Sequence, residues 1–169
     1  MPGLDEDLAN AASATPKALF GKPHLLSVED VKVMSTPLPR PNPNADSQSY
    51  WDAARERRLL IRNCKACGRR HFMPRHLCPH CWSDQLEWME SQGRGSIHSF
   101  SVVHRAPTPA FAATTPYVIA LIDLDEGPRM FANIVGDNSH DVAIGDRVSV
   151  IYEARGDGAM LPQFTRFEG

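Results

Sequence analysis

The sequence predicts a mainly β protein in which an N-terminal helix and a metal-binding ribbon precede a small barrel of five strands. Three observations lead to this class. Two Cys-x2-Cys pairs lie ten residues apart, a segment without helix breakers precedes the first pair, and short β-type segments separated by turns follow the second. The chain has 169 residues, of which 42% are hydrophobic. This length fits one domain with a small appendage and excludes a large multidomain enzyme.

A flexible, proline-rich N-terminal arm is expected over residues 1–46. Seven prolines interrupt this segment, and residues 36–44 are typical of an extended connector. The apolar residues of segment 25–34 leave a second interpretation open, in which this part forms one weak helix or docks on another surface. The rest of the chain is expected to divide into a helix with the ribbon over residues 47–92 and the barrel over residues 93–169.

A helix of about three turns is expected to begin at Ser47. Ser49 and Asp52 have the spacing of a capping box, and residues 50–60 contain neither proline nor glycine. Aromatic and alanine residues give this helix an apolar side. Arginines at helical spacing form another side: Arg55, Arg58 and Arg62.

The two cysteine pairs predict a metal site and are the strongest signal in the chain. Each Cys-x2-Cys turn directs two sulfurs toward one point, so two such pairs place four thiolates at the corners of a tetrahedron. Four soft ligands with no open position favour a structural zinc ion. The predicted ligands are Cys64, Cys67, Cys78 and Cys81.

Other interpretations of the cysteine motif are less favoured. The chain has no apolar stretch long enough to cross a bilayer and no N-terminal secretory signal, so it is expected in the cytoplasm, where stable disulfides are rare. A redox cysteine pair would normally occur once, near a βαβ pattern. Iron bound as in rubredoxin, and replacement of one cysteine by His71, His76 or His80, stay open as alternatives.

Five short segments of β character predict the barrel. Val148, Val150 and Tyr152 alternate with the residues between them, and Asp125-Glu126-Gly127 supplies a hairpin turn. At this size, five strands fit a partly open Greek-key barrel of the OB type. The expected strands cover residues 96–104, 117–124, 129–135, 147–153 and 163–167.

The motifs do not predict catalysis by this chain alone. All four cysteines are assigned to the metal, no Gly-x-Ser-x-Gly nucleophile elbow is present, and zinc held by four thiolates has no open position for activating water. Gly93-Arg94-Gly95 precedes a strand instead of a helix, so we interpret it as a turn and not as a phosphate-binding loop. An independent hydrolase or redox enzyme is therefore the least favoured class.

A net charge of −2 conceals one strongly basic segment. Residues 55–76 carry eight bases and one acid, whereas residues 83–169 carry twelve acids and six bases. The acidic barrel and a sequence pI near 6.4 argue against binding to a phosphate backbone. A single-stranded nucleic-acid-binding module, with Phe100 or Phe131 stacking on bases, is kept as the alternative function.

Eight short motifs follow one another in a specific order along residues 47–167. They are Tyr50-Trp51, Arg58-Leu59-Leu60, Cys64-x2-Cys67-Gly68, Pro74-Arg75, Cys78-Pro79-x-Cys81, Gly93-Arg94-Gly95, Pro116-Tyr117-Val118 and Ile144-Gly145-Asp146-Arg147-Val148. In order and spacing this series resembles the acyl-CoA-associated proteins named domain of unknown function thirty-five. In that family a rubredoxin-like zinc ribbon precedes an OB-fold.

This resemblance implies a non-catalytic accessory subunit that pairs with a thiolase-like or lipid-transfer-protein-like catalytic subunit in a hetero-oligomer, expected to be a heterotetramer. The partner would form or cleave a carbon–carbon bond in an acyl-CoA substrate by retro-Claisen or retro-aldol chemistry. Acetoacetyl-CoA, benzoylsuccinyl-CoA and steroid side-chain CoA esters all fit the family. The implied ligands are structural zinc and a CoA thioester, with no membrane partner.

The phosphates of a CoA thioester match the basic segment of the chain. Because guanidinium groups bind phosphate with paired hydrogen bonds, arginines in and beside the ribbon are the candidate CoA contacts. These are Arg58, Arg69, Arg70 and Arg75. An equally open interpretation is that they keep the ribbon soluble or pair with acidic residues of the partner. The loop 105–116 is expected either to contact a partner or acyl chain through Phe111, or to cover the core.

Overall fold

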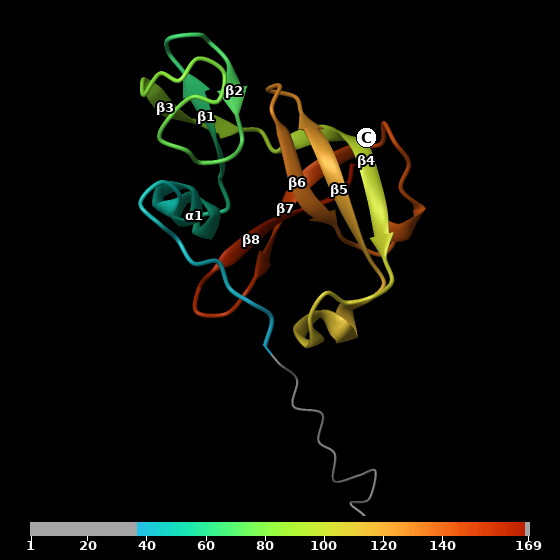
Figure 1. Cartoon of the computed structure of the whole chain (residues 1–169). Coiled ribbons are helices and arrows are strands. Elements are labelled where there is room, and N and C mark those ends of the chain that lie inside the picture. The colour runs from blue at the N-terminus through green and yellow to red at the C-terminus, as the bar shows by residue number, and fades with distance from the viewer. Residues whose placement is uncertain (1–36, 168–169) are drawn as a thin grey trace, which may run out of the picture. The chain divides into compact units, whose positions relative to one another are not determined.

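The computed structural model describes residues 37–167, in which a helix, a ribbon and a barrel follow one another along the chain (Figure 1). Most of the predicted flexible arm, including segment 25–34, lies outside the described residues. Residues 37–46 are irregular, and Arg40 forms an ion pair with Asp157 between the last two barrel strands. None of the helices in the described part has the length and apolarity that a bilayer crossing requires.

The helix α1 spans Gln48–Arg55 and is shorter than the sequence predicted. Ser47 is its N-cap, as expected, but the predicted capping box is wrong. The amide of Ser47 donates to the side-chain oxygen of Asn44 at 2.9 Å, which ties the first turn to the preceding residues. Asp52 accepts instead from the side chains of Gln48, about one turn before it, and Arg55, about one turn after it.

The helix ends early because the following residues are buried in a strand. Arg57 has a φ of +60°, which an α-helix does not continue. Leu59 and Ile61 are 1% and 0% exposed, and this burial outweighs the helical propensity of the segment. The expectation that Arg58 and Arg62 share a helical face with Arg55 is therefore wrong.

Three strands form the ribbon sheet in the order β2-β1-β3, separate from the barrel (Figure 1). The central strand pairs antiparallel with both neighbours. Its first residues lie beside α1, and its last residue is a cysteine, so the strand joins the apolar core to the cysteine turns. The strands are β1 (Leu59–Cys64), β2 (Arg70–His71) and β3 (Leu86–Ser91).

Five strands form a closed barrel in the order β4-β5-β6-β8-β7. Neighbours are antiparallel except β6 and β8, whose parallel contact pairs Ile134 with Phe164. This arrangement confirms the predicted five-stranded OB-fold, and closure follows because β4 also pairs with β7. The strands are β4 (Arg94–Val103), β5 (Tyr117–Leu124), β6 (Arg129–Ile134), β7 (Arg147–Ala154) and β8 (Met160–Arg166).

The barrel core follows the period-two pattern of its strands. Along β5 every second residue is buried, from Val118 to Leu124, as expected for a strand with a neighbour on each side. Phe164 of β8 is fully buried. The same apolar cluster continues into α1 and β1 through Tyr50 and Leu59, so helix, ribbon and barrel share one core.

Gly93 and Gly95 permit close approach where the ribbon passes into the barrel. Gly93 has a φ of +66°, and a Cβ atom there would lie 2.1 Å from Cγ1 of Val150. A Cβ atom at Gly95 would lie 2.5 Å from the carbonyl oxygen of Asp123 on β5. The predicted turn is correct for Gly93, whereas Arg94 and Gly95 already belong to β4.

The loop 105–116 contains a short 3-10 helix, η1 (Pro109–Thr114), and a second one, η2 (Ser139–Asp141), follows β6. The ring of Phe111 in η1 lies 6.3 Å from that of Tyr117 at the start of β5. This loop therefore packs against the end of the barrel through its aromatic residue.

Candidate functional site

Four cysteine sulfurs gather at the end of β1, all within 4.8 Å of one another. The Sγ atoms of Cys64 and Cys81 are 3.6 Å apart, and those of Cys67 and Cys78 are 3.7 Å apart. The structure thus brings together all four cysteines that the sequence predicted as ligands. Four sulfur donors in one cluster have the chemistry of a closed structural metal site.

The two cysteine turns have the same backbone form. In the first, the amide of Gly68 donates to the carbonyl of Cys64 at 2.8 Å; in the second, the amide of Trp82 donates to the carbonyl of Cys78 at 3.0 Å. The residue that closes each turn has a left-handed backbone, with φ of +69° at Gly68 and +63° at Trp82. Two equivalent turns therefore face each other across the cluster.

The cluster is half buried. Cys64 and Cys78 are 0% exposed, whereas Cys67 and Cys81 reach the surface. Burial favours the neutral thiol of Cys78, but amide hydrogen bonds from His80 and Cys81 and contacts with the neighbouring thiols lower its pKa to about 7. Amide donors directed at sulfur favour the thiolate form that metal binding requires.

The three histidines near the ribbon have other neighbours. Nδ1 of His71 lies 3.0 Å from the carbonyl oxygen of Met73, and Nδ1 of His80 lies 3.3 Å from a guanidinium nitrogen of Arg69. His76 lies 3.7 Å from the carboxylate of Asp46. The geometry therefore favours four cysteines over a mixed set of cysteine and histidine ligands.

The four arginines predicted to contact CoA do not all lie together. Arg58 precedes β1, whereas Arg70 pairs with Asn63 near the other end of that strand. Hydrogen bonds to Glu56 and Glu90 raise the pKa of Arg58 and occupy its guanidinium group. Arg70 donates to a backbone carbonyl of the barrel, and Arg69 lies beside a histidine. Among the described residues no side-chain partner is found for the exposed Arg75.

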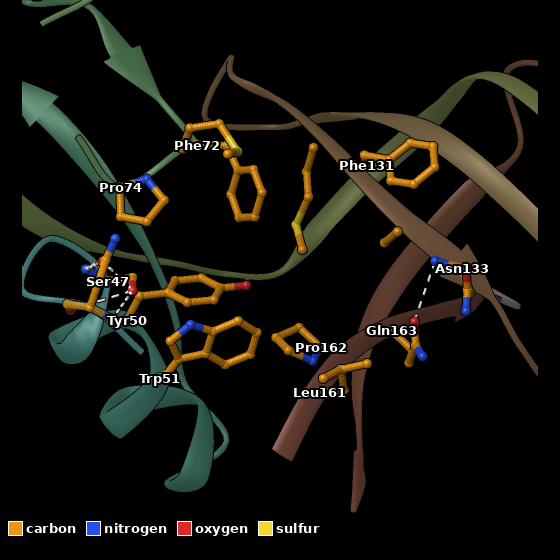
Figure 2. A pocket seen from close by; sticks show the side chains of 14 residues that line it. Ser47, Tyr50, Trp51, Phe72, Pro74, Phe131, Asn133, Leu161, Pro162 and Gln163 are labelled. Carbon is orange, nitrogen blue, oxygen red and sulfur yellow. Dashed lines mark hydrogen bonds between the residues drawn. The ribbon is translucent and has the colours of Figure 1, made fainter. Parts of the chain in front are cut away.

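An apolar cleft of about 490 Å³ lies between α1, ribbon residues 72–74 and barrel strands β6 and β8. Figure 2 shows Tyr50, Trp51 and Phe72 on one side of it and Phe131, Leu161 and Pro162 on the other. The ring of Tyr50 makes edge-to-face contacts with those of Trp51 and Phe72, at centroid distances of 4.9 and 5.7 Å. This geometry makes a rigid aromatic wall.

The rim and the inner wall of the cleft differ in exposure. Met73 and Phe131 at the rim are 55% and 59% exposed. Tyr50 is only 4% exposed, and this burial raises the pKa of its hydroxyl. Gln163 is 2% exposed and is held by the amide of Asn133 and the carboxylate of Glu153. Such a site suits an apolar group with a few polar atoms.

Sequence reasoning missed this cleft. Its walls come from four separate segments. The sequence indicated Tyr50, Trp51 and Pro74 only as parts of the family motifs, and Phe131 only as a base-stacking candidate. The structure places both Phe100 and Phe131 at the surface, 37% and 59% exposed. A pattern that would have indicated the cleft is absent, because the segments meet only after the barrel closes.

Two family models match adjoining parts of the chain. The model described as the rubredoxin-like zinc ribbon domain of ChsH2 matches residues 51–87. The model described as the C-terminal OB-fold domain of ChsH2 matches residues 88–152. The first match contains β1 and β2, and the second runs from within β3 into β7, so the matches follow the division into ribbon and barrel to within a few residues and leave out β8.

Relatives in other organisms are named as subunits and scaffolds. A probable enoyl-CoA hydratase alpha subunit of Thermomonospora curvata is 38% identical over 126 residues, 75% of this chain and 39% of its own length. A DUF35 domain-containing scaffold protein of Methanocaldococcus jannaschii is 39% identical over 104 residues, 60% of this chain and 73% of its own length. The benzoylsuccinyl-CoA thiolase subunit BbsA of Geobacter metallireducens is 35% identical over 74 residues, 44% of this chain and 48% of its own length. The chain thus spans less than half of the hydratase and thiolase subunits.

A solved structure described as an Ltp2-ChsH2(DUF35) aldolase contains a similar chain. The TM-score is 0.66 and the sequence identity 37%, covering 75% of this chain and 98% of the other. At this identity the likeness extends from the fold to individual residues.

Proposed function

This chain belongs to the DUF35 family, and from that premise we propose that it is a non-catalytic accessory subunit of a complex that processes acyl-CoA substrates. Its catalytic partner is a thiolase-like or lipid-transfer-protein-like subunit that forms or cleaves a carbon–carbon bond. The similar proteins named as thiolase subunit, hydratase subunit and aldolase component support this proposal.

The cysteine cluster supports a structural role for the metal. The donor set of Cys64, Cys67, Cys78 and Cys81 fits zinc, because four soft sulfur ligands at tetrahedral spacing complete its coordination. Bound there, zinc would supply structural stability to the ribbon. All four cysteines of the chain lie in this cluster, so none is left over as a nucleophile. Bond cleavage is accordingly assigned to the partner.

The apolar cleft is the observation that carries the proposal. Its aromatic wall and its volume of about 490 Å³ suit the acyl or pantetheine part of a CoA thioester. Two large apolar side chains at its rim, Met73 and Phe131, are more than half exposed and provide a surface for the catalytic subunit. The cleft therefore offers one place where thioester and partner meet.

The ribbon arginines are proposed to contact the phosphates of CoA. Arg75 directly follows Pro74 of the cleft wall, and its guanidinium is exposed. Arg69 is also exposed and lies in the same ribbon. Arg58 contributes less, because two glutamates already bind it. Arg70 donates one hydrogen bond to the barrel, and the other N–H groups of its guanidinium can donate to a phosphate.

Co-expression with thiolase-like and lipid-transfer-protein-like candidates tests this role. We expect one candidate to co-elute with the full chain in size exclusion chromatography, and the complex to bind a CoA thioester in calorimetry. A chain that stays alone with every candidate, and does not bind CoA esters, contradicts the proposal. A gel shift with single-stranded DNA or RNA at low salt would favour the alternative, a nucleic-acid-binding module.

Matched variants locate the binding within the complex. Phe131→Ser should weaken acyl-CoA binding by about fivefold or more, because it removes apolar area from the cleft rim. Ile144→Ser removes a side chain of similar exposure (69%) outside the cleft and should leave binding unchanged. Arg75→Gln is compared in the same way with Arg105→Gln, an exposed arginine outside the ribbon. Equal effects within either pair contradict the assigned site.

A further inference from the structure

We propose that a second cavity binds a small monocarboxylate, with Arg155 as its charged contact. This cavity of about 270 Å³ lies between η1, η2 and the ends of β5, β6 and β7. It shares only Asn133 with the lining of the apolar cleft. The inference is independent of the accessory-subunit role.

Arg155 is a buried cation with unused donors. Its side chain is 8% exposed, and Nη2 lies 3.3 Å from a carboxylate oxygen of Glu153. Nε and Nη1 are buried and have no hydrogen-bond partner among the described residues. Buried donors in folded proteins are almost always paired with protein, water or ligand, because leaving them unpaired is costly. Arg155 also lines the cavity, so an acceptor bound there would supply a partner that the described residues do not provide.

Glu153 does not complete the coordination of Arg155. Its other carboxylate oxygen accepts a hydrogen bond of 3.2 Å from the side-chain amide of Gln163. The two carboxylate oxygens of Glu153 therefore accept from two different donors. Arg155 has a single contact with Glu153, at 3.3 Å. A second acceptor is needed to satisfy the guanidinium group.

The walls of the cavity are mainly apolar. Leu38, Phe111 and Tyr117 contribute apolar surface, and the two aromatic rings lie 6.3 Å apart. His140 also lines the cavity, with Nε2 3.2 Å from the carbonyl oxygen of Pro116. The volume lies just below the range of about 300–1,000 Å³ of pockets for drug-sized molecules. The occupant is therefore a small molecule with an aromatic or short aliphatic body.

The chemistry favours a single carboxylate over a phosphate. A phosphate dianion would bring two charges into apolar walls beside Glu153, and this desolvation and repulsion disfavour it. A carboxylate has one charge, and one of its oxygens can accept from an open donor of Arg155. An aromatic body such as that of benzoate can pack beside Phe111 and Tyr117.

Titration of the full-length, metal-loaded protein with benzoate tests the site. We expect saturable one-to-one binding in calorimetry and amide shifts in NMR spectra at residues 109–117 and 153–155. Benzamide, which lacks the charge, and inorganic phosphate should each bind at least about tenfold more weakly than benzoate. The proposal is overturned if benzoate causes no saturable shifts at these residues, or if benzamide or phosphate binds equally well.

Two variants separate ligand binding from a purely structural ion pair. Arg155→Met should weaken benzoate binding about tenfold or more, whereas Arg94→Met, at an exposed barrel arginine, should leave it unchanged. Glu153→Gln keeps the side-chain volume and removes the competing charge, so benzoate should bind several-fold more tightly. If Arg155→Met does not fold, the result for Glu153→Gln decides, and unchanged or weaker benzoate binding in that variant overturns the proposal.

Discussion

The guanidinium group of Arg70 in β2 donates a hydrogen bond of 3.0 Å to the backbone carbonyl of Glu126, in the turn between β5 and β6. The side chain of Glu126 in turn accepts the amide of Gln92 at 2.6 Å, in the connection between ribbon and barrel. One barrel turn therefore contacts the ribbon sheet and also the segment that leads out of it. Arg70, a candidate CoA contact in the sequence, also links the ribbon to the barrel.

Replacing Arg70 with Gln should loosen the contact between ribbon and barrel. Loss of one hydrogen bond should lower the free energy of unfolding by about 1 kcal/mol. Arg69→Gln is the control, because the neighbouring arginine makes no such bond to the barrel among the described contacts. Thermal unfolding and hydrogen exchange of residues 92–94 and 125–128 measure the difference. Equal changes in the two variants would show that Arg70 has no linking role.

Removal of one buried cysteine should abolish metal binding. Cys64→Ser deletes a ligand that is 0% exposed, and structural zinc sites of this type contribute on the order of 10 kcal/mol to folding. We expect about one zinc per chain in the native protein and almost none in the variant, by elemental analysis. Because β1 belongs to the shared core, the barrel should also lose stability. One bound iron in place of zinc would contradict the metal assignment, and full metal content in the variant would contradict the ligand set.

Gly93→Ala should be markedly destabilising. The new Cβ atom would lie 2.1 Å from Cγ1 and 2.9 Å from Cβ of Val150, and the β-branched side chain has little freedom to move away. Overpacking of this kind typically costs about 1–3 kcal/mol, in addition to the cost of a positive φ. Gly158→Ala isolates the backbone cost, since Gly158 has a φ of +73° and no neighbour within 4 Å of a Cβ atom. Chemical denaturation should therefore show a clearly larger loss at Gly93, and equal losses would contradict the close approach.

The ion pair of Asp125 and Arg147 should give stability that depends on pH. Two hydrogen bonds of 2.8 and 2.6 Å from Arg147 lower the pKa of Asp125 below its usual range. Because the folded state has the lower pKa, the contribution is present above the unfolded pKa of about 4 and is lost as the pH falls through the folded value. Asp125→Asn should therefore lower the melting temperature slightly at pH 7, and this difference should shrink below about pH 4.

Asp137→Asn is the control for this measurement, because Asp137 is exposed and has no ion pair among the described residues. Acid release of the metal affects all three proteins alike, so differences in melting temperature are compared at each pH. A difference between Asp125→Asn and the native protein that stays constant from pH 7 to pH 3 would contradict the predicted linkage.

The five strands of the barrel could be predicted from sequence because alternation along a strand is a local property. Residues 117–124 form β5 with the predicted bounds. The C-terminal end of α1 could not be predicted in this way. Residues 50–60 contain no helix breaker, and the helix ends at Arg55 because the burial of Leu59 and Ile61 in β1 depends on pairing with β3.

In the candidate site, too, some features follow from local sequence and others depend on tertiary contacts. Its cysteines were predictable because two residues between ligands define a turn that holds two sulfurs together wherever it occurs. The partners of Arg58 and Arg70 were not, since Glu90 and Glu126 lie 32 and 56 residues away.

By itself the amino-acid sequence determined the four-cysteine motif, the order of ribbon and barrel, and the family resemblance, because each of these depends on residue types at short, regular spacing. Only the tertiary structure decided where α1 ends, which arginines have no partner within residues 37–167, and where the cleft and the cavity beside Arg155 form. These features arise when distant segments meet and bury surface together, and no local pattern along the chain encodes such meetings.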